Sequence, residues 1–236
     1  MALPGVLAIE TAGLKAWPGL EVAWDGGWIR RAANGYTKRA NSVQCLDPGD
    51  DTDAEDRLAA AARWFEARGL RPVFRQTPLT APGVLAALDA LGWNPQDRSH
   101  LLAMEVGPQK ADPRALVVPV DDPQFLAAQQ RLQGYDETTV AKLRAVCGAM
   151  TVPARGIVLH NADGEAVASG LMAVADGIAV TGNVITSRTE RRRGHAAAMM
   201  RTGLAWARAE GARVAALNVL AGNDPAIALY EGLGYR

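Results

Sequence analysis

The second half of the chain alternates between short apolar runs and alanine-rich stretches. Four runs are bounded by turn residues and rich in residues that favour strands. They predict strands over residues 156–160, 167–174, 178–186 and 214–220. The sequence Asn161-Ala162-Asp163-Gly164 joins the first two runs, and it is typical of a β-hairpin turn.

Two helices are expected in the same half. Strong helix formers predict the first from about Ala196 to Glu210, and Gly211 stands where a left-handed glycine ends a helix. Asn223 or Asp224 can cap the second helix, which has Pro225 at its start and runs to about Leu233. The order strand, loop, helix, strand, helix indicates a layered α/β arrangement.

The first half has a similar but weaker pattern. Asp25-Gly26-Gly27 separates two short strands, Glu21–Trp24 and Trp28–Ala32. A helix is expected from about Asp53 to Gly69. A strand over 71–77, a helix over 82–91 and a closing strand over 99–106 complete the predicted elements.

The two halves are related by an internal repeat. An offset of 142 residues aligns Trp64 with Trp206 and Leu91 with Leu233. The same offset aligns the glycine pair 69 and 92 with the pair 211 and 234, and the two glycines of each pair lie 23 positions apart. A repeat of this length indicates two copies of one structural unit. Chance similarity between alanine-rich helices that end in glycine is the alternative.

A break lies between the halves. The stretch Gly107-Pro108-Gln109-Lys110-Ala111-Asp112-Pro113 combines a glycine, two prolines and charged residues, which is typical of a linker. We therefore expect one domain over residues 1–107 and a second over 113–236.

Composition changes this picture little. Lys plus Arg equals Asp plus Glu, at 25 each in 236 residues, so the net charge gives no argument for nucleic acid or an anionic membrane. Cys45 and Cys147 show no metal-ligand spacing, and no disulfide framework or metal site is expected. With no secretion signal in residues 1–13 and no membrane-length apolar run, a cytoplasmic location is expected.

The candidate chemistry lies at Arg191-Arg192-Arg193-Gly194-His195-Ala196, between a predicted strand and a predicted helix. The first N–H groups of a helix are unpaired and bind phosphate. Small residues at 194 and 196 let a pyrophosphate approach the backbone, and the arginines add positive charge. We expect the backbone of His195 to matter here more than its imidazole.

The residues Arg191-x-x-Gly194-x-Ala196 resemble the acyl-CoA loop of the GNAT N-acetyltransferase superfamily, Gln/Arg-x-x-Gly-x-Gly/Ala. Downstream, Asn223-x-x-Ala226-x-x-Leu229-Tyr230-x-x-x-Gly234-Tyr235 resembles the superfamily's second signature. The two motifs together cover about residues 183–236. The resemblance implies an α/β (α+β) fold class with two GNAT-like domains, each a mixed, mostly antiparallel sheet flanked by helices.

The resemblance also assigns roles to residues. Val184, Ile185 and Thr186 would pair with the pantetheine arm of acetyl-CoA, and splaying of their strand from 214–220 would form the slot for the thioester. The N–H groups of Arg192, Arg193, Gly194, His195, Ala196 and Ala197 would hold the pyrophosphate, with Arg191 opening the loop. Asn223 would touch the cofactor arm. Tyr230 would protonate the departing thiolate, since a phenol is protonated at neutral pH.

The implied reaction is direct attack of a neutral primary amine on the thioester in a ternary complex, without a cysteine nucleophile. Neither Glu190 nor Asp224 stands at a position that identifies it as the base, and a water chain would also serve. The base therefore stays open. The acceptor is a small-molecule or protein amine, and the chain is expected to be a monomer or homodimer that binds neither nucleic acid nor membrane.

The first half lacks the features of this site. The repeat offset places Gly49-Asp50-Asp51-Thr52-Asp53-Ala54 opposite the arginine loop, and Leu88 opposite Tyr230. An acidic loop repels pyrophosphate. We expect a degenerate GNAT-like domain and one cofactor per chain. Its stretch 28–43, with two aromatics and several cations, is either part of the acceptor pocket or an exposed basic hairpin.

Two further alternatives concern the sheet and the activity. The superfamily has another strand after its Gly-Tyr signature, which here falls at residues 234–235. Either the chain is short, leaving an open edge that favours dimerisation, or another segment supplies that strand. A non-catalytic acyl-CoA-binding or sensing module is the alternative to an enzyme. A nucleic-acid-binding domain built on the arginines is disfavoured by the neutral net charge.

Overall fold

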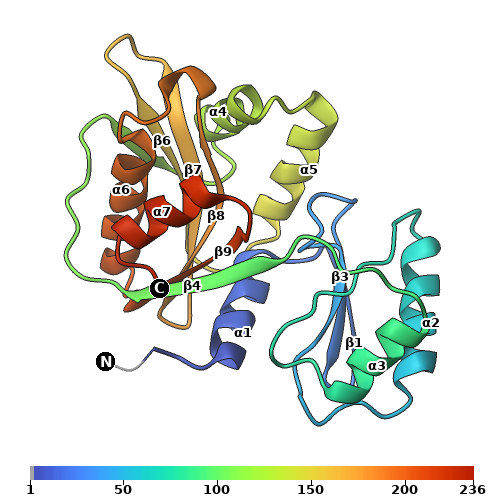
Figure 1. The fold of residues 1–236 in the computed structure, drawn as a ribbon. Helices are drawn as coiled ribbons and strands as arrows, with labels where there is room; N and C mark the ends of the chain where they lie inside the picture. Colours follow the sequence, from blue (N-terminus) through green and yellow to red (C-terminus); the bar gives the residue numbers. More distant parts are fainter. Residues whose placement is uncertain (1–2) are drawn as a thin grey trace.

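The computed structural model describes residues 3–236, which form a larger and a smaller lobe (Figure 1). The larger lobe is built on a six-stranded sheet with the order β4-β9-β8-β7-β6-β5. Its strands are β4 (Ser99–Glu105), β5 (Ala115–Val118), β6 (Ala154–His160), β7 (Ala166–Ala175), β8 (Ile178–Thr186) and β9 (Val214–Leu220). All neighbours pair antiparallel except β8 and β9, which are parallel.

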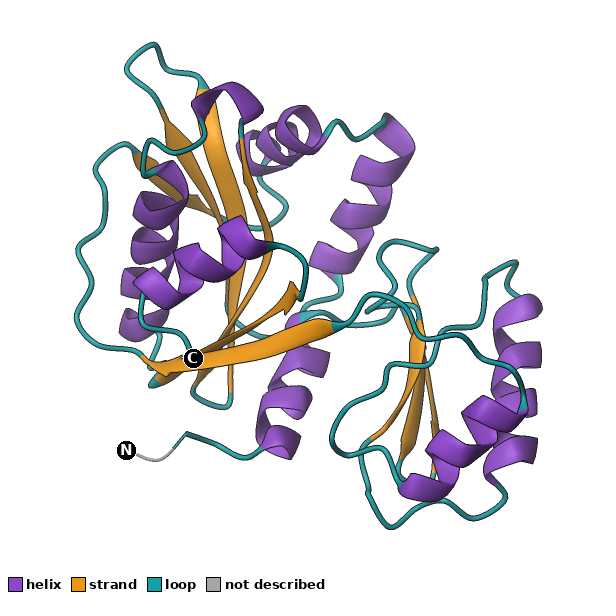
Figure 2. Cartoon of the chain, viewed as in Figure 1, coloured by secondary structure: helices purple, strands orange, loops and turns teal. Residues whose placement is uncertain are grey.

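Helices cover both faces of this sheet (Figure 2). On one face lie α6 (His195–Ala209) and α7 (Asp224–Gly232), whose core includes Leu217 of β9. On the other lie α1 (Val6–Ala16), α4 (Pro123–Gln133) and α5 (Glu137–Gly148), whose core includes Val180 and Ala216. Successive strand residues thus enter opposite cores, which is why these strands read as continuous apolar runs rather than alternating ones.

The smaller lobe is an antiparallel sheet of β1 (Glu21–Asp25), β2 (Trp28–Ala32) and β3 (Ser42–Cys45), with α2 (Ala54–Glu66) and α3 (Pro82–Ala90) packed together beside it. The strand predicted over 71–77 is wrong in extent, because only Phe74 bridges, in parallel, to Val43. Proline at positions 72 and 78 removes two backbone donors, and β3 is only four residues long.

The internal repeat is visible in the elements. Shifting α7 by the offset of 142 residues gives the bounds of α3, and shifting α6 gives α2 to within one residue at each end. The parallel bridge between Val43 and Phe74 in the smaller lobe corresponds to the parallel pairing of β8 with β9 in the larger lobe. The structure therefore has the predicted α/β (α+β) class, with two related units of mixed, mostly antiparallel sheet flanked by helices.

The first half of the chain contributes two segments to the larger lobe, and this differs from the expected division at residues 107–113. Strand β4 does not close the smaller sheet; it pairs with β9 along its whole length, from Ser99↔Leu220 to Glu105↔Val214. Helix α1 also packs on the larger sheet, with Ile9, Ala12 and Ala16 in its core. The physical reason is that β9 has an edge to cover, and a segment before the linker supplies the strand. Strand β4 is therefore the neighbour of β9, and Arg236, which follows the Gly-Tyr signature, pairs with β4 through two backbone hydrogen bonds with Ala103.

The predicted linker has no helix or strand, yet it is fixed along α6. The Arg208 guanidinium donates to the Val106 carbonyl at 2.9 Å, and the Asp112 N–H donates to the Thr202 hydroxyl at 2.9 Å. These contacts hold the crossover from β4 to β5 against the helix that opens at the arginine loop. Among residues 3–236, no helix combines the length and apolar character needed to cross a membrane.

Candidate functional site

The two central strands of the larger sheet separate at one end. Parallel pairing runs from Ile178↔Val214 to Thr181↔Leu217 and then stops. Beyond that point β8 stays paired with β7, and β9 stays paired with β4. The splay that the sequence led us to expect between these strands is present, and residues 182–186 are partly exposed along it.

The arginine loop follows directly from the splayed end of β8. A short 3-10 turn, Arg188–Glu190, leads into the loop, and α6 begins at His195. Arg192 and Gly194 both adopt left-handed backbone conformations, with φ of 65° and 78°. Within residues 3–236 no acceptor is found for the backbone N–H groups from Arg192 to Ala197. Six unpaired donors at a helix start form a site for an anion.

Charge at the loop is positive and exposed. The three arginine side chains lie at the surface, and Arg193 forms an ion pair with Glu190 at 2.9 Å. Arg191 and Arg192 have no ion-pair partner among the described residues, so both remain available to a ligand. Gly194 has no heavy atom within 4 Å of the position of an added Cβ, so open space lies over this turn.

His195 is held below the loop rather than in it. The residue is 7% exposed, and its Nε2 lies 3.3 Å from Glu190 Oε2. Its Nδ1 is buried without a hydrogen-bond partner. Glu190 thus bridges Arg193 and His195, which fixes the loop through side chains while the backbone N–H groups stay free.

Tyr230 lies on α7 and faces the sheet. It is 7% exposed, and its ring contacts Tyr235 edge-on at 5.9 Å between centroids. Burial raises the pKa of Tyr230 to about 12, so the phenol keeps its proton at neutral pH. Among residues 3–236 no hydrogen bond to its hydroxyl is found, which leaves the proton free for a ligand.

Asn223 occupies the cap position of α7, but its side chain makes no capping hydrogen bond. Its carbonyl accepts from the N–H groups of Ala226 and Ile227 at 3.0 Å each. The exposed side-chain amide therefore takes no part in helix capping.

The sequence does not predict a polar contact that joins the splayed end of β8 to the smaller lobe. A β-bulge interrupts β8 opposite β7, and Asn183 has a left-handed φ of 52° there. Its amide donates to the Tyr36 hydroxyl at 2.9 Å, and its carbonyl accepts from buried Gln129 at 3.0 Å. Asparagine favours this backbone conformation, but a bulge has no signature within one strand's sequence.

Tyr36 belongs to the stretch 28–43 of the smaller lobe, which the sequence left open between a pocket wall and an exposed basic hairpin. Arg31, Tyr36, Asn41 and Ser42 are all at most 5% exposed. The exposed-hairpin alternative is therefore wrong for these four residues. Tyr36 among them makes a contact between the two lobes, through Asn183 and Tyr135.

The acidic loop of the smaller lobe is filled by its own side chains. Asp50 accepts from the Gly27 N–H at 2.7 Å and from the Arg57 guanidinium at 2.7 Å, and this contact with Arg57 lowers the pKa of Asp50. The Asp51 carboxylate packs within 2.5 Å of where a Cβ on Gly83 would lie. Carboxylates therefore occupy the place where the larger lobe leaves unpaired donors.

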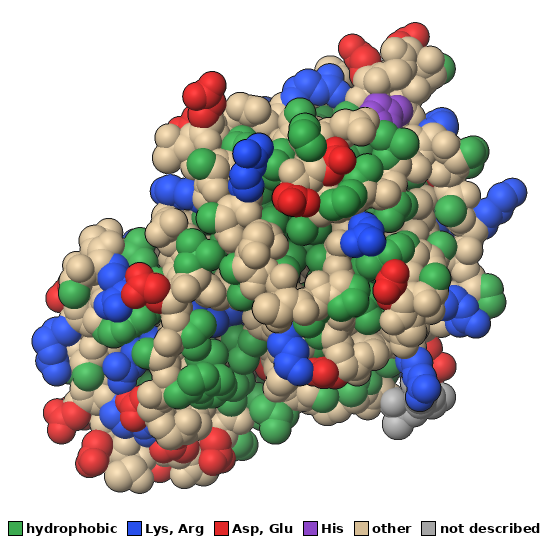
Figure 3. All heavy atoms as spheres, turned by 180° about the vertical axis from the view of Figure 1, so that it is seen from behind, with side chains coloured by type: hydrophobic (Ala, Val, Ile, Leu, Met, Phe, Trp, Pro, Cys, Tyr) green, Lys and Arg blue, Asp and Glu red, His purple; other side chains and the backbone are tan. Residues whose placement is uncertain are grey.

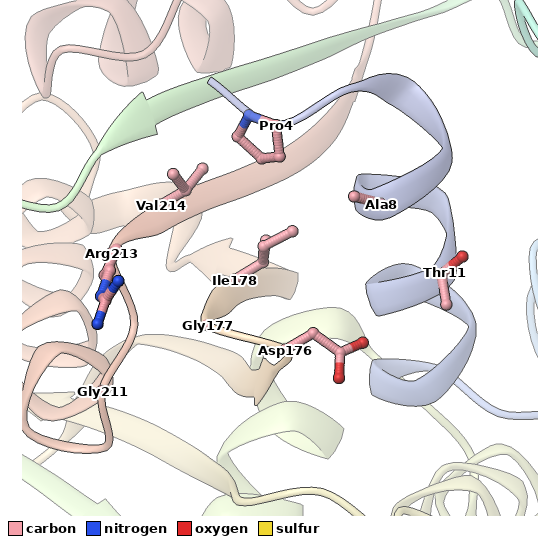
Figure 4. Close-up of a pocket in the computed structure, with 9 residues that line it drawn as sticks. All are labelled: Pro4, Ala8, Thr11, Asp176, Gly177, Ile178, Gly211, Arg213 and Val214. Atoms are coloured by element: carbon pink, nitrogen blue, oxygen red, sulfur yellow. The ribbon is translucent and has the colours of Figure 1, made fainter. Parts of the chain in front are cut away.

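A separate hollow of the larger lobe lies away from this site. It has a volume of about 530 Å³ and is lined by residues of α1 and by the opposite ends of β8 and β9 (Figure 4). Asp176 points along its wall and is paired with Lys15 at 2.7 Å. None of the predicted site residues lines it. No group of three His, Cys, Asp or Glu side chains within residues 3–236 is placed to hold a metal ion.

A comparison with protein families now adds to this geometry. The family model described as the C-terminal region of the probable histone acetyltransferase Rv0428c matches residues 5–236. The chain belongs to this family of GNAT-type acetyltransferases. It is 37% identical over 67 residues to the probable histone acetyltransferase Rv0428c of Mycobacterium tuberculosis. That alignment covers 28% of this chain and 21% of the relative, so the matched part spans about a fifth of that protein's length.

Solved structures show the same fold. A GCN5-related N-acetyltransferase from Kribbella flavida superposes with a TM-score of 0.72 at 21% identity, over 100% of this chain and 93% of the other. A tandem GNAT protein from the clavulanic acid biosynthesis pathway gives a TM-score of 0.63 at 14% identity, over 100% and 86% of the two chains. The second match agrees with the tandem arrangement seen here.

Proposed function

We propose that the chain is an N-acetyltransferase that moves the acetyl group of acetyl-CoA to a primary amine by direct attack in a ternary complex. The observation that supports this most is the splay of β8 from β9, which opens directly onto a loop of unpaired backbone donors. A slot beside an anion site matches an acyl-CoA, which has a thioester at one end of its arm and a pyrophosphate at the other.

Each predicted residue has a role in this proposal. The N–H groups of Arg192 to Ala197 bind the pyrophosphate, and Arg191 and Arg192 add charge-assisted contacts. The partly exposed end of β8, Val184 to Thr186, pairs with the pantetheine arm, and Asn223, at the start of α7 just after β9, contacts the same arm. The cofactor is thus clamped between the two splayed strands.

Tyr230 acts as the general acid. When the amine attacks, the thiolate of CoA leaves with a negative charge and needs a proton. Burial stabilises the neutral phenol, so Tyr230 arrives protonated and its hydroxyl has no competing acceptor. The smaller lobe binds no second cofactor, because its corresponding loop is occupied by Asp50 and Asp51.

The name of the Mycobacterium tuberculosis relative suggests a protein amine as acceptor, while the tandem GNAT protein comes from a small-molecule pathway. The proposal covers both kinds of acceptor. The amine reaches the thioester from the face of the sheet opposite α6, where the smaller lobe meets the splay.

The direct test is release of free CoA thiol from acetyl-CoA during incubation with a panel of primary amines. We expect amine-dependent thiol release in wild type, with formation of an equimolar N-acetyl product by mass spectrometry. Tight acetyl-CoA binding without amine-dependent release from any acceptor would support a binding or sensing module instead.

A further inference from the structure

A second cavity lies between the lobes, beside the point where β8 and β9 separate. It is lined on the sheet side by Val180, Ala216, Leu217 and Asn218. Leu217 is in the last parallel pair, and Asn218 is the first residue of β9 beyond it. The cavity therefore adjoins the thioester slot of the proposed function, on the face of the sheet covered by α1.

The charged side chains of the cavity come from four separate segments. Arg31 lies on β2, Arg39 between β2 and β3, Arg75 after α2, and Glu10 on α1. Glu10 pairs with Arg75 at 2.5 Å and accepts from Gln44 at 2.8 Å. Three guanidinium groups therefore face one carboxylate, and the cavity has an excess of positive charge.

This excess charge is only partly compensated by the protein. Arg31 is 2% exposed, and its terminal nitrogens donate to the carbonyls of Trp17 and Arg39, while its Nε has no hydrogen-bond partner. Burial, followed by repulsion from Arg75 and Arg39, lowers the pKa of Arg31 to about 9. No hydrogen bond or ion pair of the Arg39 guanidinium is found among the described residues, and burial lowers its pKa too. Buried charge without a partner is costly, and an anion in the cavity relieves that cost.

Resting on the proposed function, we infer that this cavity binds the carboxylate of the acceptor, so that the substrate is an amine that also bears a carboxylate. The guanidinium groups of Arg39 and Arg75 bind the carboxylate directly. The positive charge of Arg31, which lies deeper, adds to the electrostatic attraction. Guanidinium groups match carboxylates in a bidentate geometry. The amine end then extends past Asn218 toward the thioester.

The charge also selects against other acceptors. A lysine in a basic protein segment brings positive neighbours into a positive cavity, which is unfavourable. The cavity is small, with a volume of about 20 Å³. Arg39 and Arg75 are only partly buried, so their flexible side chains can turn outward to admit a carboxylate. Figure 3 shows the two lobes from behind, with hydrophobic side chains gathered near their junction.

The test compares matched acceptors in the full chain with saturating acetyl-CoA. Straight-chain ω-amino acids from glycine to 6-aminohexanoate are each paired with their primary amide, and a lysine peptide with capped ends is added. We expect kcat/KM, measured by thiol release, to favour the best carboxylate over its amide by about tenfold or more. Arg39→Gln should lower kcat/KM for that carboxylate by about 10- to 100-fold, mainly through KM, and leave its amide unchanged.

Arg71→Gln is the matched control, since Arg71 is an exposed arginine of the same lobe outside the cavity, and it should change neither rate. Arg39→Lys keeps the charge without the bidentate geometry and should fall between wild type and Arg39→Gln. Equal rates for acids and amides, an unchanged ratio in Arg39→Gln, or transfer only to the lysine peptide overturns the inference and leaves the proposed function standing. Absence of transfer to every amine contradicts both.

Discussion

At the scale of single residues, Tyr230 has the most direct chemical role in the proposed reaction. Its hydroxyl is the one predicted proton donor in the slot, and substituting phenylalanine keeps the ring contact with Tyr235. We expect Tyr230→Phe to lower kcat by about 100-fold or more, with little change in the affinity for acetyl-CoA. Steady-state kinetics with titration of acetyl-CoA separates the two effects, and a kcat within threefold of wild type would show that the residue only packs.

The raised pKa of Tyr230 also predicts a pH profile. A group whose pKa is raised to about 12 stays protonated at every pH below that value, so the acid is not lost on the alkaline side of neutrality. We expect kcat at saturating amine to show no decline assignable to the tyrosine between pH 7 and 10. A descending limb in that range that disappears in Tyr230→Phe would contradict this assignment.

At the scale of elements, α4 is fixed against β6 by one close contact. A Cβ on Gly156 of β6 would lie 2.3 Å from the Phe125 ring of α4, and Phe125 is fully buried. We expect Gly156→Ala to lower the free energy of unfolding by about 1–3 kcal/mol, because the core has no room to give. Gly148→Ala, in α5 with nothing within 4 Å, is the control and should not destabilise the chain. Urea unfolding measures both, and equal stabilities would refute the packing argument.

The elements of the larger lobe near the site were predictable because each has a local signal. Apolar runs bounded by turns give β8 and β9 with their observed ends, and Gly211 ends the first helix with a left-handed φ of 92°. Helices α1, α4 and α5 were missed, and so were β3 and β5. These strands are only four residues long, too short for a pattern to stand out.

Which strand each predicted strand pairs with could not be predicted from the sequence. The segment Ser99–Glu105 was correctly predicted as a strand, but its pairing with β9 rather than with the smaller sheet depends on which edge is open. The same holds for the site. The loop 191–197 is local and was found, whereas the contact between Tyr36 and Asn183 joins residues 147 positions apart. The cavity between the lobes is likewise assembled from separate segments and has no local signature.

At the scale of the whole molecule, β4 and α1 tie the two lobes together, because both segments belong to the first half of the chain and pack in the larger lobe. The core that contains α1 also contains Ala33, Tyr36 and Ala40 of the smaller lobe. We therefore expect one cooperative unfolding transition, with calorimetric and van't Hoff enthalpies that agree. Two resolved transitions would show that the lobes are independent.

A substitution in β4 tests the same coupling. The Ala103 N–H donates to the Arg236 carbonyl at 2.9 Å, and Ala103 also pairs with Ala216 of β9. Proline at position 103 removes that donor and disturbs the strand. We expect Ala103→Pro to lower the melting temperature of the single transition by several degrees and to weaken acetyl-CoA binding. A melting curve in which only one lobe is destabilised would contradict the coupling.

The tandem arrangement leads to an asymmetric molecule. One loop has unpaired backbone donors and arginines, while its counterpart is filled by Asp50 and Asp51. The smaller lobe has instead become part of the wall beside the splay, through Tyr36 and the arginines of the cavity. We propose that one copy of the repeat binds the cofactor and that the other helps to bind the acceptor.

Calorimetric titration of the full chain with acetyl-CoA tests the central claim most directly. The account predicts one binding site per chain, lost or weakened at least about tenfold when Arg191 and Arg192 are replaced by serine, and unchanged when Asp51 is replaced by asparagine. Absence of binding at millimolar acetyl-CoA by a folded chain, or two sites per chain, would contradict it.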